Sequence, residues 1–386
     1  MSAADRETDT VVETLPPLIH DPEEENVVET RSTSSPPVHS SEADNAVETL
    51  SASSPPVSDP EADGRERTSQ VIKTPDSKRD IGFAEYGSQS GSPVFYFHGL
   101  PGSRFEALFW EANATALGVR LIALDRPGMG LSTRDSARTM PGYPADVAAV
   151  AKHLKLERYF VLAVSGGSGY ALACAEQKDQ LPGLQGVGVV GGLGPRNLTQ
   201  KGMGLIQRLS YYAMDWVPHG AVGWLWDAMI GKSARNPDPT VLEKAVRKGL
   251  KMEAKGPDAE IVKDENILRA LADSLRGAFA QGSHGYVDEA SLVVKPWGFN
   301  LEDIKDVQVR LWYGEKDELA PPAVGKAMAD KIPGAVFTEF EGESHTASVV
   351  KHQQVILTEL CGLETENASR DGMVLDQDGR VKPNDG

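Results

Sequence analysis

Residues 159–173 constrain the fold of this chain more than any other stretch of the sequence. Tyr159 to Val164 form an apolar, β-branched and aromatic run, which predicts a buried strand. Ser165 and two glycines follow, and an Ala/Leu/Tyr pattern then predicts a helix. A strand that turns into a helix within two residues strains the backbone at its tip and lifts that side chain clear of the sheet. The stretch therefore predicts a nucleophile elbow with Ser165 as the nucleophile.

The elbow departs in one position from the usual Gly-x-Ser-x-Gly pattern, because Ala163 stands where the first glycine is expected. Gly166 and Gly167 still supply the small residues needed where the helix start crosses the strand end. The helix N-terminus also places backbone N–H groups where an oxyanion could form. A glycine-rich turn between strand and helix is also typical of nucleotide-binding folds, so this stretch alone leaves that alternative open.

Charge is distributed unevenly along the 386 residues, whose formal net charge is −17. Residues 1–63 hold fifteen Asp/Glu and two Arg, a net of −13, which leaves −4 for the remainder. This Ser/Pro-rich segment has a degenerate repeat of 19 residues without a hydrophobic face. Residues 1–67 are therefore predicted to be a disordered acidic tail, either a solvated extension or a docking spacer, and residues 363–386 a second disordered tail.

From residue 68 onward, short apolar runs alternate with helical patterns, which predicts a mostly parallel sheet flanked by helices. The alternation covers residues 68–195 and 306–362, so we expect these two segments to form one α/β core. The predicted strands, eight in number, lie near residues 71–72, 81–86, 93–97, 119–124, 159–164, 184–190, 307–313 and 336–340.

The strand pattern stops over residues 196–305, which predicts a helical cap with helices near 239–251 and 265–280. Four of the six tryptophans lie here, at positions 216, 224, 226 and 297. Trp216, Trp224 and Trp226 are candidate substrate-binding residues, and the alternative is that they pack the cap onto the core. The run from Val222 to Trp226 could equally form a membrane-facing patch.

Three residues that follow predicted strands have the chemistry of a catalytic triad. A serine hydroxyl needs a base to take its proton, and the base needs a carboxylate that fixes its tautomer. Ser165, Asp317 and His345 provide the three groups, each on a loop expected at the same edge of the sheet. Their order along the chain is the one expected of α/β-hydrolases.

A tetrahedral oxyanion also needs two N–H donors. Gly166 offers one, and Leu100 offers the other from the loop after the strand at 93–97. We expect His98 and Gly99 to shape that loop rather than to transfer protons. His219 and His284 lie in the predicted cap and are interpreted as ordinary polar residues. No metal site and no cofactor are expected.

The motifs resemble those of the α/β-hydrolase superfamily over roughly residues 80–361. His-Gly-Leu-Pro-Gly-Ser-Arg at 98–104 and Asp-Arg-Pro-Gly-Met-Gly at 125–130 are similar to the His-Gly-x-Pro-Gly-Ser-Arg group of serine hydrolases with a helical cap, distantly related to proline iminopeptidase-like enzymes. The resemblance implies an α/β-hydrolase fold, with an eight-stranded sheet and a cap after the sixth strand. The elbow has Gly166 where those peptidases usually show tryptophan, which argues against aminopeptidase activity. A serine nucleophile argues against epoxide hydrolase and dehalogenase chemistry.

These features predict a carboxylesterase-like serine hydrolase that cleaves an ester, thioester or lactone of a moderately apolar small molecule. The alternatives are an isomerase, cyclase or C–C hydrolase on the same triad, or a ligand-binding receptor that turns over slowly. The acidity argues against a nucleic-acid partner, and we expect neither a membrane partner nor a disulfide between Cys174 and Cys361. The chain is expected to be cytoplasmic; its substrate and oligomeric state do not follow from the sequence.

Overall fold

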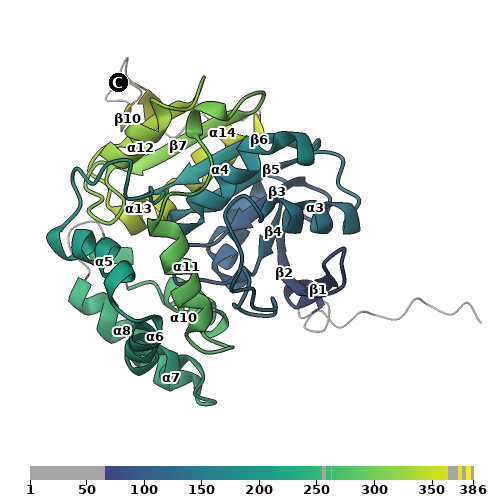
Figure 1. The fold of residues 1–386 in the computed structure, drawn as a ribbon. Coiled ribbons are helices and arrows are strands. Elements are labelled where there is room, and N and C mark those ends of the chain that lie inside the picture. The colour runs from purple at the N-terminus through teal and green to yellow at the C-terminus, as the bar shows by residue number, and fades with distance from the viewer. Residues whose placement is uncertain (1–65, 254–257, 262, 364–372, 376–379, 384–386) are drawn as a thin grey trace, which may run out of the picture. The chain divides into compact units, whose positions relative to one another are not determined.

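The computed structural model describes residues 66–253, 258–261, 263–363, 373–375 and 380–383. The expected tail at residues 1–67 falls almost wholly outside the described residues. Figure 1 shows a twisted sheet with helices packed against it, and a group of cap helices to one side.

Eight strands follow the predicted positions closely. They are β1 (Gln70–Lys73), β2 (Asp80–Gly87), β3 (Ser92–Phe97), β4 (Val119–Leu124), β5 (Tyr159–Val164), β6 (Leu184–Val190), β7 (Gln308–Gly314) and β8 (Val336–Phe340). Two short strands, β9 (Met373–Leu375) and β10 (Arg380–Pro383), add to the edge beyond β8. These two lie within residues 363–386, which the sequence predicts to be a disordered tail.

The strand order is β1-β2-β4-β3-β5-β6-β7-β8-β10-β9. Strands β3 to β8 are parallel to one another. Strand β2 pairs antiparallel with both β1 and β4, and β10 pairs parallel with β8 and antiparallel with β9. The chain passes from β3 to β4 on one side and then returns to β5 on the other side of β3. Loops diverge at such a switch point, so the carboxyl ends of β3 and β5 leave room for a site there.

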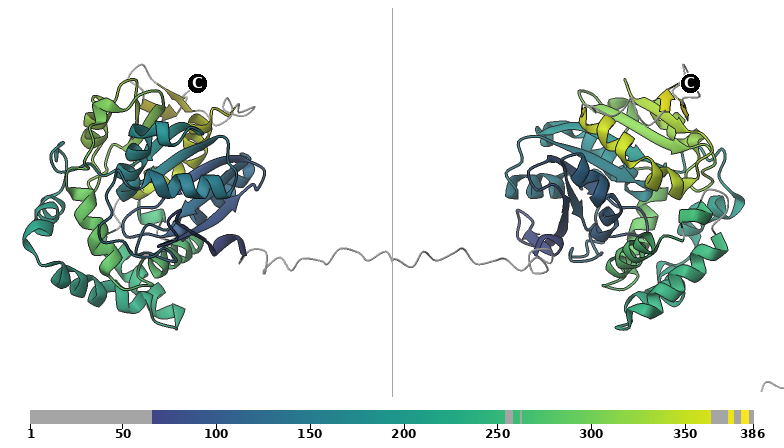
Figure 2. Two further views of the ribbon diagram at one scale, coloured as in Figure 1. Left: turned by 45° about the vertical axis from the view of Figure 1, so that its right-hand side comes forward. Right: turned by 180° about the vertical axis from the view of Figure 1, so that it is seen from behind.

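Two apolar cores cover the two faces of the sheet, because successive strand side chains point to opposite faces. Val161 and Ala163 of β5 belong to one core, and Leu162 and Val164 to the other. The helices of the sheet domain are η1 (Arg104–Trp110), α2 (Glu111–Ala116), α3 (Pro144–His153), η2 (Ser165–Gly167), α4 (Ser168–Glu176), η3 (Lys178–Gln180), α12 (Pro322–Ala329), α13 (His345–Lys351) and α14 (Gln353–Cys361). Figure 2 shows helices on both sides of the sheet.

The cap lies between β6 and β7, which are neighbours in the sheet. Its helices are α5 (Leu205–Trp216), α6 (His219–Trp226), η4 (Asp227–Gly231), α7 (Lys232–Ala234), α8 (Pro239–Glu253), α9 (Asp258–Ile261), α10 (Glu265–Ala278), α11 (His284–Val294) and η5 (Leu301–Asp303). The predicted helices at 239–251 and 265–280 correspond to α8 and α10.

Local features set the bounds of three helical segments. The segment after Ser103 starts as the 3₁₀ helix η1 and continues as α2. Helix α3 starts at Pro144, whose fixed φ suits the first turn. The helical segment after β8 is divided at His352 into α13 and α14.

Both cysteines are free thiols, as the sequence predicts. Burial raises the pKa of Cys174 in α4 well above its ordinary value and raises the pKa of Cys361 to about 12. Within the described ranges, no helix is both long enough and apolar enough to cross a bilayer.

Candidate active site

Ser165 lies at the tip of β5 with its backbone in the left-handed region, at φ +51°. A non-glycine residue is held there only when the surrounding structure requires it. Gly167 shows what surrounds the tip, because a methyl group on it would lie 2.6 Å from the Phe97 carbonyl oxygen. The start of helix α4 thus passes directly over the end of β3, and Ser165 has the strained turn that the sequence predicts.

Asp317 and His345 follow β7 and β8 and are hydrogen-bonded to each other. The distance from His345 Nδ1 to Asp317 Oδ2 is 2.6 Å. The other carboxylate oxygen of Asp317 accepts the backbone N–H groups of Leu319 and Ala320, at 2.9 and 2.7 Å. Because a carboxylate only accepts, His345 Nδ1 carries the proton and Nε2 is left as the basic nitrogen.

Gly191 shows how close the imidazole lies to Ser165. Val164 of β5 pairs with Val190 of β6, so Ser165 and Gly191 are the next residues on two adjacent strands. A methyl group on Gly191 would lie 3.0 Å from His345 Cε1 and 3.4 Å from Asp317 Oδ2. Adjacent strands are about 4.8 Å apart, so the imidazole lies over the strand next to Ser165.

The Ser165 hydroxyl makes no hydrogen bond to His345 in this structure or to any other described residue. Hydrogen bonds between a nucleophile and its base commonly tighten only in the substrate complex. Ser165 and His345 both retain some exposure to solvent.

The pKa of His345 is raised above its ordinary value. Burial alone would lower it, but the charge and hydrogen bond of Asp317 outweigh that effect, and Asp258 and Glu106 add to it. Asp258 belongs to cap helix α9, and its carboxylate accepts a hydrogen bond of 2.5 Å from the Ser344 hydroxyl. A cap residue therefore contributes to the electrostatics of the imidazole.

Leu100 and Gly166 lie against each other at the switch point, as the predicted oxyanion donors require. A methyl group on Gly166 would lie 2.7 Å from Leu100 Cβ and 3.4 Å from the Leu100 nitrogen. His98 is fully buried in the same loop, and its Nδ1 lies 2.9 Å from the Gly99 carbonyl oxygen. Burial, assisted by the charge of Arg126, lowers the pKa of His98 well below its ordinary value. A neutral, buried His98 fits a residue that shapes the loop.

Glu106 also holds the loop that contains Gly99 and Leu100. The sequence did not single out this residue. Its Oε1 accepts the Gly99 N–H at 2.8 Å and the Tyr96 hydroxyl at 3.0 Å. A methyl group on Gly99 would lie 3.4 Å from Glu106 Oε2 and 3.5 Å from Ser165 Cβ. Burial raises the pKa of Glu106. Its signal in the sequence is an acidic residue two positions after the Gly-Ser-Arg motif.

Arg126 holds the same loop by hydrogen bonds to two backbone carbonyl groups of the loop. It donates to the His98 oxygen at 2.6 Å and to the Gly99 oxygen at 2.8 Å. Its Nε lies 2.6 Å from Glu289 of cap helix α11, and both side chains are fully buried. The counter-ion of Arg126, which holds the loop, therefore comes from the cap.

Arg104 and Asp125 join the two motif loops that the sequence singles out. Their side chains form an ion pair of 2.7 Å, and both are almost fully buried. Gly130 has φ +49°, and a side chain there would collide with the Asp125 carboxylate. These contacts explain why an arginine and closely spaced glycines appear in these two motifs.

The three tryptophans proposed for substrate binding differ in their surroundings. Trp216 and Trp224 are 85% and 70% exposed, which is not the position of residues that line an enclosed cavity. Trp226 packs inside the cap, with its ring centroid 4.2 Å from that of Tyr286. Trp297 is buried against Gly169 of α4, in the packing role. The two cap histidines, His219 and His284, are exposed, as expected of ordinary polar residues.

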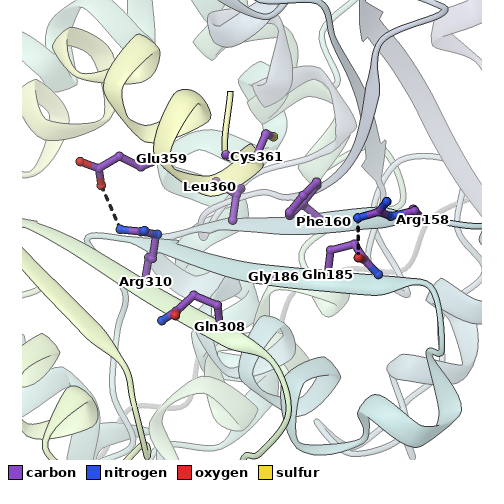
Figure 3. A pocket seen from close by; sticks show the side chains of 10 residues that line it. Arg158, Phe160, Gln185, Gly186, Gln308, Arg310, Glu359, Leu360 and Cys361 are labelled. Carbon is purple, nitrogen blue, oxygen red and sulfur yellow. Dashed lines mark hydrogen bonds and ion pairs between the residues drawn. The ribbon is translucent and has the colours of Figure 1, made fainter. Parts of the chain in front are cut away.

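A separate hollow lies at the amino ends of the strands, away from the candidate active site. Figure 3 shows it between Phe160, Gly186 and Arg310, which lie near the beginnings of β5, β6 and β7. Ligands of parallel sheets bind at the carboxyl ends of the strands, where Ser165 and His345 lie. Across the described ranges, no group of three or more His, Cys, Asp or Glu is arranged to hold a metal ion.

Comparison with known proteins agrees with this fold. Residues 94–356 match the model of the alpha/beta hydrolase family. The chain belongs to that family. No curated protein matches the chain in sequence.

Solved structures share the fold at low identity. An esterase, RhEst1, from Rhodococcus sp. ECU1013 superposes with a TM-score of 0.53 and 18% identity over 77% of this chain and 100% of its own. An enol-lactonase from Burkholderia xenovorans LB400 has a TM-score of 0.52 and 16% identity, covering 76% of this chain and 100% of its own. A bromoperoxidase from Bacillus anthracis has a TM-score of 0.55 and 16% identity, with the same two coverages. They confirm the α/β-hydrolase fold with its mostly parallel sheet.

Proposed function

We propose that the protein is a serine hydrolase that cleaves an ester, thioester or lactone of a moderately apolar small molecule. The observation that carries the proposal is the Asp317–His345 pair at 2.6 Å, lying over Gly191 on the strand beside the strained Ser165. A base whose tautomer is fixed, next to a serine lifted from the sheet, is the arrangement that activates a hydroxyl. Among proteins of the same fold, one is named an esterase and another an enol-lactonase, and both names fit acyl–oxygen chemistry.

The proposed reaction has two halves that use the same three side chains. His345 Nε2 takes the proton of Ser165 as Oγ attacks the acyl carbon, and the imidazolium then protonates the leaving oxygen or sulfur. Asp317 keeps Nδ1 protonated and stabilises the imidazolium. Water, deprotonated by the same nitrogen, then attacks the acyl carbon, and the imidazolium returns the proton to Ser165 Oγ as the ester bond breaks and the acid is released.

The negative charge that develops on the acyl oxygen needs donors that are already in place. The N–H groups of Leu100 and Gly166 are proposed to supply them. Such donors contribute a large part of catalysis because they need no reorganisation during the reaction. Glu106 and Arg126 act as positioning residues, since they hold the loop that carries Leu100.

A fluorophosphonate probe tests the nucleophile directly. We expect wild-type protein to be labelled and Ser165→Ala to resist labelling. The matched control is Ser168→Ala in the same elbow, because the Ser168 hydroxyl is buried and donates to the Leu193 oxygen at 2.5 Å. Labelling of Ser165→Ala at the wild-type rate would contradict the assignment.

A panel of p-nitrophenyl esters, lactones and thioesters tests the reaction class. Turnover of at least one member, abolished by Ser165→Ala, is the expected result. A protein that is labelled at Ser165 but turns over no acyl substrate would contradict hydrolysis and favour an isomerase or a ligand-binding receptor.

A further inference from the structure

Helix α5 of the cap presents an uncovered apolar surface. Leu205, Leu209, Tyr212 and Trp216 recur at the spacing of one helix face, and Ile206 borders it. We call these five residues the α5 apolar face; the exposed fractions of Ile206 and Leu209 are 84% and 60%. The helix has a separate buried face, formed by Tyr211 and Met214, which attaches it to the cap.

The size of this face exceeds what a surface normally carries. An aromatic side chain has about 150–250 Å² of area, so Tyr212 and Trp216 alone expose roughly 300 Å² at their exposed fractions of 48% and 85%. Contiguous apolar patches above a few hundred Å² mark interaction sites. The segments that follow continue the trend, because Trp224 and Leu225 of α6 and Met229 of η4 are also exposed.

Charge around the face selects the kind of partner. Residues 196–235 contain five Lys/Arg and two Asp, a net of +3 in a chain of net −17. Lys201, just before α5, and Arg208, on α5, are exposed, and no described acidic side chain forms an ion pair with them. Asp227 is bound to Arg235 at 2.6 Å.

From the apolar face and its basic border, we infer that the cap binds the surface of a membrane that contains anionic phospholipid. Apolar and aromatic side chains would enter the boundary between headgroups and acyl chains, and Lys201 and Arg208 would contact the phosphates. Tryptophan and tyrosine prefer that boundary. The helix would lie on the bilayer and not cross it.

A second copy of the chain fits the same face less well. A two-fold contact through α5 would bring Arg208 of each copy toward the other, and like charges at an interface are unfavourable. Membrane binding also differs from the expectation drawn from the sequence. The net acidity of the chain, which would oppose binding to anionic lipid, lies mainly in residues 1–63, which carry −13 of the −17.

Vesicle flotation of the full chain tests the inference. We expect the protein to float with vesicles of phosphatidylcholine and phosphatidylglycerol, and more weakly with phosphatidylcholine alone. Ile206→Asp/Leu209→Asp should weaken flotation at least tenfold, and Arg208→Glu about fivefold with anionic vesicles only. Tryptophan emission should shift to shorter wavelength on binding, because Trp216 and Trp224 leave water.

The control variant is Val71→Asp, which places an acid at a comparably exposed apolar residue (48%) on edge strand β1. We expect it to float like the wild type. Hydrolysis of a water-soluble p-nitrophenyl ester should be unchanged in the α5 variant, which separates this inference from the proposed function.

Two results would overturn the inference. One is absence of flotation with every vesicle composition, including the case in which light scattering instead shows a dimer that the α5 variant dissociates. The other is flotation that the α5 variant leaves unchanged.

Discussion

Replacing Glu289 by leucine should destabilise the protein far more than removing the neighbouring acid. The Glu289 carboxylate is fully buried, forms an ion pair with Arg126 Nε at 2.6 Å, and accepts hydrogen bonds from Arg138 at 2.9 Å and the Tyr170 hydroxyl at 2.8 Å. Leucine would leave two buried guanidinium groups without their anion. Removing one partner of a buried ion pair costs about 3–5 kcal/mol of unfolding free energy. For a domain of this size, we expect the melting temperature to fall by about 10 °C.

The matched comparison is Asp288→Asn at the adjacent position. Asp288 pairs at 2.7 Å with Arg134, whose side chain is 43% exposed, and such pairs contribute about 0–1 kcal/mol. Glu289→Gln keeps an oxygen acceptor and should fall between the two. Urea unfolding followed by circular dichroism measures all three variants.

Activity provides a second measurement on the same variants. Arg126 donates to the carbonyl groups of His98 and Gly99, so its displacement moves the loop that carries Leu100. A shift of about 1 Å in such a group can cost about 10²-fold in rate. If the free energies of unfolding of Glu289→Leu and Asp288→Asn differ by less than about 1 kcal/mol, Glu289 does not stabilise the buried Arg126 and Arg138.

Three further predictions concern the site itself. Gly191→Ala should lower kcat by about 10²-fold, because its methyl group meets the His345 ring at 3.0 Å, whereas Gly220→Ala, with no atom within 4 Å, should not. Asp258→Asn should shift the acidic limb of the pH–rate profile to lower pH: the rate rises as the His345 imidazole loses its proton, and the lost negative charge lowers that pKa. Glu106→Leu should lower kcat about tenfold or more at unchanged KM by freeing the loop N–H, while Glu106→Gln, which can still accept, should restore most of the rate; equal rates for both variants would contradict the positioning role.

Local sequence patterns were sufficient to predict the sheet and the chain order of the expected triad. Strands β5 and β6 were predicted at their observed bounds because buried parallel strands are continuous apolar runs with glycine at their ends. Ser165, Asp317 and His345 could be proposed because all three follow strands, and parallel strands end at one edge of a sheet.

Partners that are far apart in the chain could not be predicted in this way. Arg126 and Glu289 meet only because a cap helix packs onto a loop of the core, and no spacing in the sequence encodes that contact. The exposure of Trp216 and Trp224 could not be predicted for a similar reason: composition shows that a helix is apolar, but not which of its faces is covered.

The position of the cap has a consequence for building chimaeric hydrolases. Because β6 and β7 are adjacent in the sheet, the cap between them leaves and re-enters the core at one place. The cap could therefore be replaced by the cap of another enzyme. Such a graft would remove Glu289 and leave the buried guanidinium groups of Arg126 and Arg138 without their carboxylate counter-ion. A working chimaera must therefore import a carboxylate at the equivalent place, or lose both guanidinium groups together with the cap.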